Sequence, residues 1–373
     1  MTRRSFVTAM GAAPAFPQGS FAPLFDGRTL DGWRVVDGPE SAFYVRDGAI
    51  VVHSGSNFPT WLRSAQRYEN FEFRCEVLIQ GWANGGLYFH APEFGPPAEC
   101  GVKLNLFQKK DATPLRESMG AIFPVIAPRK VNVRNQGEWN AIRVLADGPA
   151  LRVWINEELV HDLNRDEHPE LRYRLRSGYI GIESLSYPLR FRGLEIRELP
   201  PREKWTELYR REEDLSLWEA VEKPKIEALG EVLRTDGLGY LATRDSYGDF
   251  AFQCYIRASK HSNGGVIFRA SSEKTSEHYE IQLHDVEGAV YPTGSLYGYQ
   301  RAHPYPRIEP EKWYLFQLFA EGPRCVVRVN GVAVVDYPAM QRLSPGKIML
   351  QAHQMGKWIE YREIRVRAVG PRA

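Results

Sequence analysis

The sequence lacks the features that mark several large classes of protein. It has no run of about 18 apolar residues, the length that a membrane-spanning helix needs. Its 48 basic and 46 acidic residues are interspersed and leave a net charge of only +2, which argues against a nucleic-acid partner. It also has no serine nucleophile elbow, phosphate loop, His-Glu-x-x-His motif or dinucleotide fingerprint. We therefore expect a globular protein with no membrane span and no nucleic-acid partner.

Cysteine is scarce as well, with four residues at positions 75, 100, 254 and 325. None of them forms a Cys-x-x-Cys pair or a zinc-binding spacing. Cys75 and Cys254 each follow two phenylalanines at alternate positions, which predicts that the thiols point into a core. We interpret the cysteines as small buried hydrophobic residues without a chemical role.

The first residues carry a different signal. Thr2–Val7 resembles a twin-arginine export motif, and a short apolar stretch and the small-residue segment Ala13–Ala15 follow it. We expect residues 1–19 to be an export-type signal, which would place the mature protein in the periplasm or outside the cell. The alternative is a disordered start that is rich in small residues.

The rest of the chain repeats itself. Asn70–Val77 is echoed by Asp249–Ile256, and Asn84–His90 by Asn263–Arg269, both at an offset of 179 residues. Later segments repeat in the same order at offsets of 174 and 168, as deletions in loops would produce. This period is too long for a solenoid or a propeller blade, so each copy is a domain. We expect one domain over 20–199 and a second over 203–370, joined near Pro200–Pro201.

Each copy reads as a series of short strands separated by polar turns. Aromatic and β-branched residues are frequent, and helical stripes are absent. Asn330–Gly331 between two apolar runs is a strong hairpin signal. These patterns predict an all-β sandwich or jelly roll. The expected strands are Phe71–Ile79, Gly86–Ala91, Val102–Phe107, Ala141–Leu145, Leu151–Ile155, Tyr179–Glu183 and Leu189–Arg197 in the first copy, and Phe250–Arg257, Val266–Ala270, Tyr279–His284, Trp313–Ala320, Cys325–Val329, Lys347–Ala352 and Ile359–Val366 in the second.

The motifs within these strands resemble the 3-keto-disaccharide hydrolase family, formerly a domain of unknown function, whose members have a concanavalin-A-like jelly-roll fold. The resemblance covers nearly the whole chain after residue 20. It rests on Leu24–Trp33, Asn263–Arg269, Tyr279–Gln282 with Asp285, Gly294–Gly298, Trp139–Asn140, Val329–Gly331, Ile348–His353 and Phe191–Ile196.

The resemblance implies two tandem jelly-roll domains and a site in the second. The first copy keeps the opening motif, but it has His90 in place of Arg269 and Leu185 in place of His353. It also lacks the Glu-x-Gln pattern around Val102–Asn105. We therefore expect the first copy to hold a degenerate site and to act as a binding or packing partner.

Alternation along strands indicates which side chains of the second copy gather. Glu280, Gln282 and His284 should share one face, while Ile281 and Leu283 point into the core. Met349, Gln351 and His353 should share a face, as should Ile267 and Arg269. Amides and carboxylates bind sugar hydroxyls, and rings such as Tyr297, Tyr299 or Trp358 can cover a pyranose. The candidate catalytic residues are Glu280 and His353, and the candidate substrate-binding residues are Arg269, Gln282, His284, Asp285, Tyr297 and Gln351.

The resemblance implies hydrolysis of 3-keto-glycosides, by removal of the carbon-2 proton and elimination of the aglycone. Glu280 or His353 would be the base, and Arg269, or a divalent metal held by Glu280 and His353, would stabilise the oxyanion. No spacing dictates a metal. Three other interpretations stay open: a non-catalytic carbohydrate-binding protein, a structural tandem module, and a merely solvated strand face. Arg269 could also pair with Glu280 across the sheet.

Overall fold

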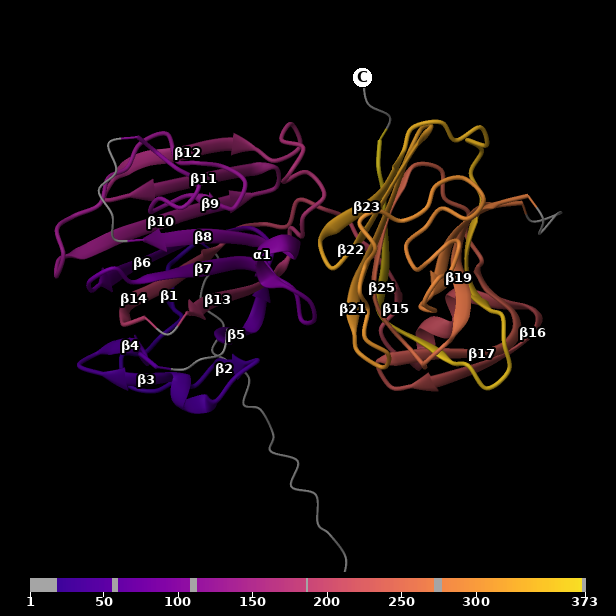
Figure 1. The fold of residues 1–373 in the computed structure, drawn as a ribbon, viewed down its shortest axis with the longest axis horizontal. Coiled ribbons are helices and arrows are strands. Elements are labelled where there is room, and N and C mark those ends of the chain that lie inside the picture. The colour runs from indigo at the N-terminus through magenta and orange to yellow at the C-terminus, as the bar shows by residue number, and fades with distance from the viewer. Residues whose placement is uncertain (1–18, 56–59, 108–112, 186, 272–276, 371–373) are drawn as a thin grey trace, which may run out of the picture.

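The chain folds into two β-sandwich units that lie side by side (Figure 1). A computed structural model describes residues 19–55, 60–107, 113–185, 187–271 and 277–370. The export-type segment predicted over 1–19 lies outside the described residues except for Gly19. Every strand pair in the described part of the chain is antiparallel, which confirms the predicted all-β jelly-roll class.

The first unit packs two sheets face to face. One sheet has the strand order β12-β11-β10-β6-β14-β4-β3, with β1 on β14, and the other has the order β2-β5-β13-β7-β8-β9. Between them lies one apolar core, which Phe71 and Phe73 enter from β6 and Leu104 enters from β8. The elements are β1 (Ala22–Pro23), β2 (Trp33–Val36), η1 (Glu40–Ala42), β3 (Phe43–Arg46), β4 (Ala49–Val52), β5 (Thr60–Tyr68), β6 (Phe71–Ile79), β7 (Asn84–Ala91), α1 (Pro97–Cys100), β8 (Val102–Phe107), β9 (Ile122–Phe123), β10 (Trp139–Asp147), β11 (Ala150–Ile155), β12 (Glu158–Asn164), β13 (Gly178–Ser184) and β14 (Leu189–Glu198).

The second unit repeats this plan, but its two layers are continuous. The strand order is β20-β19-β24-β17-β25-β18-β21-β22-β23, with β15 on β25 and β16 on β17. The long strand β17 pairs with β25 in one half and with β24 in the other, and Gly237 and Gly239 between the halves have φ of +87° and +132°. Glycine adopts these angles without strain, so the strand passes from one layer to the other. The elements are β15 (Thr206–Tyr209), η2 (Glu212–Leu217), β16 (Trp218–Leu229), β17 (Val232–Thr243), β18 (Phe250–Ala258), β19 (Asn263–Ala270), β20 (Tyr279–His284), β21 (Tyr314–Glu321), β22 (Arg324–Val329), β23 (Val332–Tyr337), β24 (Lys347–Ala352) and β25 (Ile359–Ala368).

The strands predicted from the sequence are all present, with ends that differ by three residues at most. The hairpin at Asn330–Gly331 is also confirmed, because both residues have positive φ, as a two-residue turn of this kind requires. The predicted burial of the cysteines is confirmed too, since all four are free and buried. Burial raises the pKa of the Cys75 thiol, so the inert thiol form is favoured.

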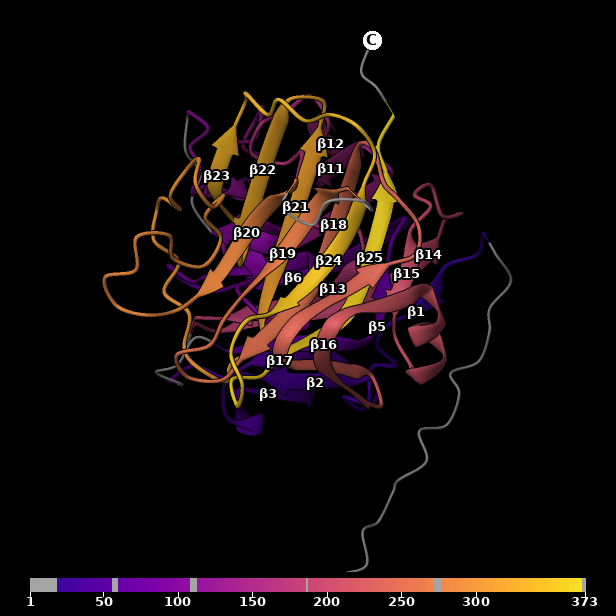
Figure 2. The same ribbon diagram turned by 90° about the vertical axis from the view of Figure 1, so that its right-hand side faces the viewer.

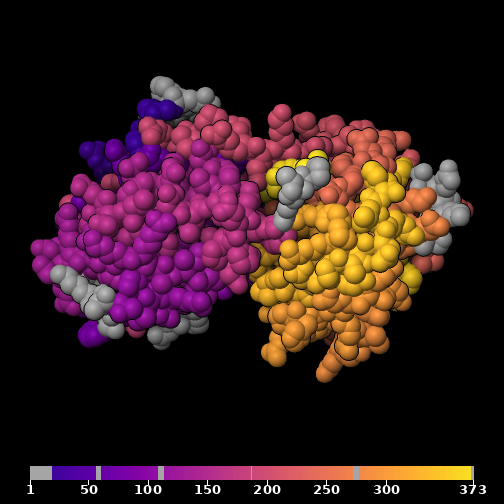
Figure 3. Space-filling view, turned by 90° about the horizontal axis from the view of Figure 1, so that it is seen from above, coloured from indigo at the N-terminus to yellow at the C-terminus, as the bar shows by residue number. Residues whose placement is uncertain are grey.

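The two units are in contact (Figure 3), and an apolar patch lies between them with ion pairs beside it. Phe94 of the first unit stacks on Trp313 of the second, and its ring also contacts the edge of Tyr255. Cys100 and Leu175 complete this patch from the first side. The sheet face of the second unit that includes β18, β21 and β22 is therefore covered, whereas β16, β17 and β19 lie on the side remote from the first unit (Figure 1).

Among the described residues, no helix is long and apolar enough to cross a membrane.

Candidate functional site

The candidate site is the outer face of the strands β16, β17, β24, β19 and β20 in the second unit (Figure 2). In the register of these strands, Ile267 lies opposite Glu280 and Gly265 lies opposite Gln282. On the other side of β19, Gly265 lies opposite Gln351. Glu280, Gln282 and Gln351 therefore stand on one face, as the alternation predicts. Ile281 and Leu283 are buried in the core on the opposite face.

Glu280 is a half-buried carboxylate that makes no hydrogen bond or ion pair within the described part of the chain. Burial raises its pKa from 4.5 to about 7, because the carboxylate loses water without gaining a charged partner. A Cβ placed on Gly265 would come within 2.5 Å of Oε1 of Glu280, so the glycine makes the room that this carboxylate occupies. A base with a pKa near neutrality is suited to proton transfer at physiological pH.

Two amides flank this carboxylate along the sheet. The Nε2 group of Gln282 donates to the Asn263 Oδ1 atom at 2.7 Å and to the Gly264 carbonyl at 3.1 Å, which fixes its orientation. Gln351 is buried, but its side chain makes no hydrogen bond with any residue in the described ranges, so its amide is free to contact a ligand. Tyr240 on β17 lies opposite Gln351 and adds a half-buried ring to the same face.

Tyr297 and His284 lie at the margin of this face. The backbone N–H of Tyr297 donates to the carbonyl of Glu280 at 2.9 Å, and the neighbouring Leu296 is buried in the core beside Ile281. Tyr297 therefore points to the side of Glu280, and the residue is 53% exposed. The Nδ1 atom of His284 is 3.1 Å from the carbonyl of Ser262, to which it donates, so this histidine is held by the backbone.

The structure does not place Arg269 with these residues, and the expectation that it joins Glu280 is wrong. The register of β19 on β24 shifts between Ile267 and Ala270, and Arg269 has a φ of +52°. This bulge breaks the alternation and turns the side chain away from the face. The guanidinium is fully buried, pairs with Asp249 at 2.7 Å and donates to the carbonyl of Arg342 at 2.9 Å.

Asp285 is also separate from the face. It follows β20 and has the same parity as Ile281 and Leu283, which point into the core. Its charge acts on the buried phenol of Tyr314, and burial raises the pKa of Asp285 itself to about 6. Its Oδ1 atom is buried and has no hydrogen-bond partner among the described residues. We therefore place Asp285 at the end of the sandwich core.

His353 follows the end of β24 and is exposed. Its position continues the parity of Gln351, but no contact joins it to Glu280 in the described part of the chain. Among the described residues, no three His, Cys, Asp or Glu side chains are grouped so that they could hold a metal ion. The pair Glu280 and His353 does not fit a metal centre, and we derive no step through one.

The same face of the first unit is built differently. By register, Lys103 takes the place of Glu280, Glu183 that of Gln351 and Tyr88 that of Ile267. Nζ of Lys103 is 2.6 Å from Oε2 of Glu183, and the Tyr88 hydroxyl donates to Oε1 of Glu183 at 2.5 Å. All three are buried. The only carboxylate of this trio is therefore paired, whereas Glu280 is not.

Sequence reasoning missed Tyr240, Lys103 and Glu183. Tyr240 was missed because the glycines of β17 interrupt the alternation of polar and apolar residues, so no strand was predicted there. The signal for Lys103 was available: Val102–Asn105 aligns with Tyr279–Gln282, which places a lysine in a buried strand. A buried lysine needs an anionic partner. Its partner was not predictable, because that depends on the pairing of β7 with both β8 and β13.

Comparisons with known proteins returned several solved structures. A solved glycosyl hydrolase-like protein from Parabacteroides distasonis matches at 20% identity and a TM-score of 0.42, covering 48% of this chain and 94% of that one. A family 66 carbohydrate-binding module from Bacillus subtilis matches at 15% identity and a TM-score of 0.34, covering 45% and 96% respectively. A Bacillus subtilis protein with a galectin-like fold matches at 13% identity and a TM-score of 0.38, covering 49% and 97%. A search of curated proteins gave no significant match.

The family comparison is more specific. The profile described as a 3-keto-alpha-glucoside-1,2-lyase-like domain matches residues 20–197 and again 204–367. The two matches correspond to the two β-sandwich units and together cover most of the sequence. The chain therefore belongs to the family of 3-keto-alpha-glucoside-1,2-lyase-like domains and contains two tandem copies of that domain.

Proposed function

We propose that the second unit cleaves 3-keto-glycosides, with Glu280 as the base. The observation that carries this proposal is the unpaired, half-buried carboxylate of Glu280, whose pKa is raised to about 7. Its position on a face with two amides and the Tyr297 ring suits a pyranose, whose hydroxyls need donors and acceptors and whose C–H face needs a ring. Family membership supplies the substrate class.

The chemistry follows from the ketone at carbon 3, which acidifies the hydrogen on carbon 2. Glu280 would take that proton, and the electrons of the C2–H bond would form an enolate with the oxygen on carbon 3. The enolate electrons would then form a C1=C2 double bond and restore the ketone as the C1–O bond to the aglycone breaks. The protonated Glu280 could return its proton to the departing oxygen, since its pKa permits both forms near neutral pH. Addition of water across the double bond would complete a net hydrolysis.

The enolate-like oxygen needs a donor, and Arg269 cannot be that donor because its guanidinium is buried against Asp249. The free amide of Gln351 is the group we assign to this role. His353 would contact the substrate only at the margin, beyond the end of β24.

The test is release of p-nitrophenol from p-nitrophenyl 3-keto-glucoside by the purified chain. We expect Glu280→Gln to lower kcat by about 10²–10⁴-fold, the usual contribution of a general base. Glu287→Gln is the matched control, because it makes the same change at an exposed residue of the same unit. Turnover by Glu280→Gln equal to that of the control would overturn the assignment. A parallel assay with chelator reports whether a divalent metal takes part.

The second candidate function is carbohydrate binding without turnover. It is favoured by one observation: in the described residues no acid or second base contacts Glu280. Calorimetric titration with the same keto-glucoside separates the two functions. An enzyme should lose turnover but keep binding in Glu280→Gln, whereas a binding protein should bind the unaltered glycoside and never release the aglycone.

A further inference from the structure

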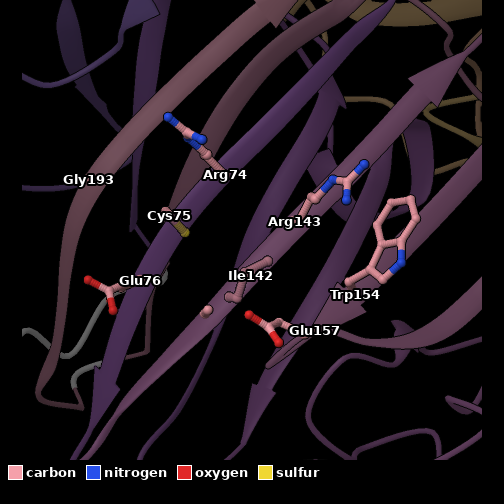
Figure 4. Close-up of a pocket in the computed structure, with 9 residues that line it drawn as sticks. Arg74, Cys75, Glu76, Ile142, Arg143, Trp154, Glu157 and Gly193 are labelled. Carbon is pink, nitrogen blue, oxygen red and sulfur yellow. The ribbon is translucent and has the colours of Figure 1, made fainter. Parts of the chain in front are cut away.

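A hollow lies on the first unit, on the outer face of the sheet that contains β6, β10, β11 and β14 (Figure 4). Its volume is about 580 Å³, within the range of roughly 300–1,000 Å³ that small-molecule sites occupy. Lys103 and Glu183 lie on the outer face of the other sheet of the first unit. The hollow is therefore separate from the face described above. It is lined by Arg74, Cys75, Glu76, Ala141, Ile142, Arg143, Trp154, Glu157 and Gly193.

Two arginines of this hollow are oriented by their neighbours, and each keeps N–H groups that no described residue accepts. The guanidinium of Arg143 lies 4.2 Å from the centre of the Trp154 ring, and its Nε atom donates to Glu72 at 2.6 Å. Arg74 donates from Nε to Glu195 at 2.5 Å. Within the described residues the terminal Nη groups of both arginines make no hydrogen bond, so donors that these contacts orient remain available.

Acceptors stand on the other side of the hollow (Figure 4). One oxygen of Glu76 accepts a hydrogen bond from Arg192 at 2.7 Å, which orients the carboxylate. Glu157 is exposed and makes no ion pair with any residue the structure describes. The charged groups of the lining are two arginines and two glutamates, which sum to zero. A neutral ligand rich in hydroxyl groups fits this balance, whereas an anion or a cation gains no net attraction.

The backbone conformation of Glu157 also indicates that this hollow is a functional site. Asn156 and Glu157 form a hairpin turn with φ of +49° and +69°, and the equivalent turn in the second unit is Asn330–Gly331. Glycine adopts a positive φ freely, while a glutamate there costs about 1 kcal/mol or more. Strained residues of this kind gather at functional sites, and here the strain places a carboxylate at the rim of the hollow.

The second unit shows what happens when this face is used for domain packing. By register, Gln253, Gln317 and Arg328 take the places of Arg74, Arg143 and Trp154. Gln317 and Arg328 both donate to the carbonyl of Tyr173 in the first unit, and all three are buried. A Cβ on Gly331 would come within 2.5 Å of Glu99, so the glycine permits this docking. The charged hollow of the first unit has no such partner in the described chain.

We propose that this hollow binds a neutral oligosaccharide, with Trp154 and Arg143 as its wall and Glu76 and Glu157 as acceptors. The first unit would then hold the sugar chain while chemistry takes place elsewhere. The site does not depend on the function proposed for Glu280.

The experiment is calorimetric titration of the full chain with cellohexaose, maltohexaose and mannohexaose, and with the anionic hexamer of galacturonate. We expect at least one neutral hexaose to bind, and Trp154→Ala and Arg143→Ala to weaken its binding at least tenfold. Trp82→Ala is the matched control, because it removes an exposed tryptophan of the same unit that does not line the hollow. Glu280→Gln should leave this binding unchanged, which separates it from the other face.

Glu157→Gly gives a second measurement that a structural role would not produce. This variant should raise the midpoint of thermal unfolding, because it relieves the strained turn. It should nevertheless weaken the binding of the neutral hexaose at least threefold. The proposal is overturned if none of the neutral hexaoses binds, if Trp154→Ala binds as tightly as the control, or if only the galacturonate hexamer depends on Trp154. Keto-glucoside turnover should be unaffected in Trp154→Ala, so failure of either proposal is seen without the other.

Discussion

Arg67 of the first unit donates hydrogen bonds from both terminal nitrogens to the carboxylate of Glu363 in the second, at 2.5 and 2.6 Å. The Nη2 atom of Arg67 also contacts Glu93 at 2.7 Å, and Glu93 in turn meets Arg362 at 3.1 Å. Burial alone would raise the pKa of Glu363, but the hydrogen bond and charge of Arg67 more than offset it, so the pKa is lowered. This bidentate pair joins the two tandem copies, beside the apolar patch around Phe94 and the hydrogen bonds to the Tyr173 carbonyl.

Removal of Arg67 should therefore weaken the coupling between the two units. Arg67→Ala leaves Glu363 largely buried without its partner, at a cost of about 3 kcal/mol. We expect calorimetry to show two separate unfolding transitions where the unaltered chain has transitions that overlap. Acid should act the same way: because the pKa of Glu363 is lowered in the folded chain, its contribution is lost as the pH falls below 4.5. Arg152→Ala breaks the exposed pair with Asp162 and is the control, and an equal loss there would contradict the role of Arg67.

Ionisation of Glu280 should make the folded chain less stable as the pH rises, which is opposite to the effect of Glu363. Its folded pKa of about 7 exceeds the ordinary value of 4.5, so between these values the folded state holds more protons than the unfolded state. Stability therefore falls as the pH rises through this window, by about 3 kcal/mol at most. We expect Glu280→Gln to gain stability relative to the unaltered chain at pH 8 but not at pH 4, as measured by urea unfolding. A constant difference between the two proteins at both pH values would show that Glu280 ionises freely.

The strands were predictable because local alternation decides them, as in β6, β8 and β20, whose ends the sequence analysis placed correctly. The gathering of Glu280, Gln282 and Gln351 also followed from alternation within β20 and β24. Arg269 did not follow, because its side chain is redirected by a bulge that depends on pairing with a distant strand. Asp249, its partner, precedes β18 and carries no local signal. The charged hollow around Trp154 was not foreseen either, since residues of four strands build it and β6, β10 and β14 are distant from one another in sequence.

Arg269 should accordingly behave as a structural residue. Arg269→Ala removes a buried guanidinium that pairs with Asp249 and holds the carbonyl of Arg342, so we expect a loss of about 3 kcal/mol in unfolding free energy. Turnover of the keto-glucoside per folded molecule should change less than twofold. Arg244→Ala, at an exposed residue of the same unit, gives the baseline for loss of a surface arginine. A hundredfold fall in kcat with unchanged stability would instead return Arg269 to the site.

His90 stands at the matching position of the first unit and should make that unit sensitive to acid. Its Nε2 atom donates to the Glu69 carbonyl at 2.7 Å, and Nδ1 accepts from Arg165 at 3.2 Å, which requires the neutral ring. Burial, followed by the charge of Arg165, lowers the pKa of His90 from 6.5 to about 3. Between these pKa values the unfolded chain therefore binds a proton that the folded chain does not bind. Stability is lost as the pH falls from 6.5 towards 3, by an amount on the order of 3 kcal/mol. In His90→Gln, whose amide can donate and accept at similar points, the fall in unfolding free energy between pH 7 and pH 4 should be smaller than in the unaltered chain. His53→Gln, at an exposed histidine of the same unit, should keep the full fall, and equal slopes in all three proteins would mean that His90 is protonated without cost.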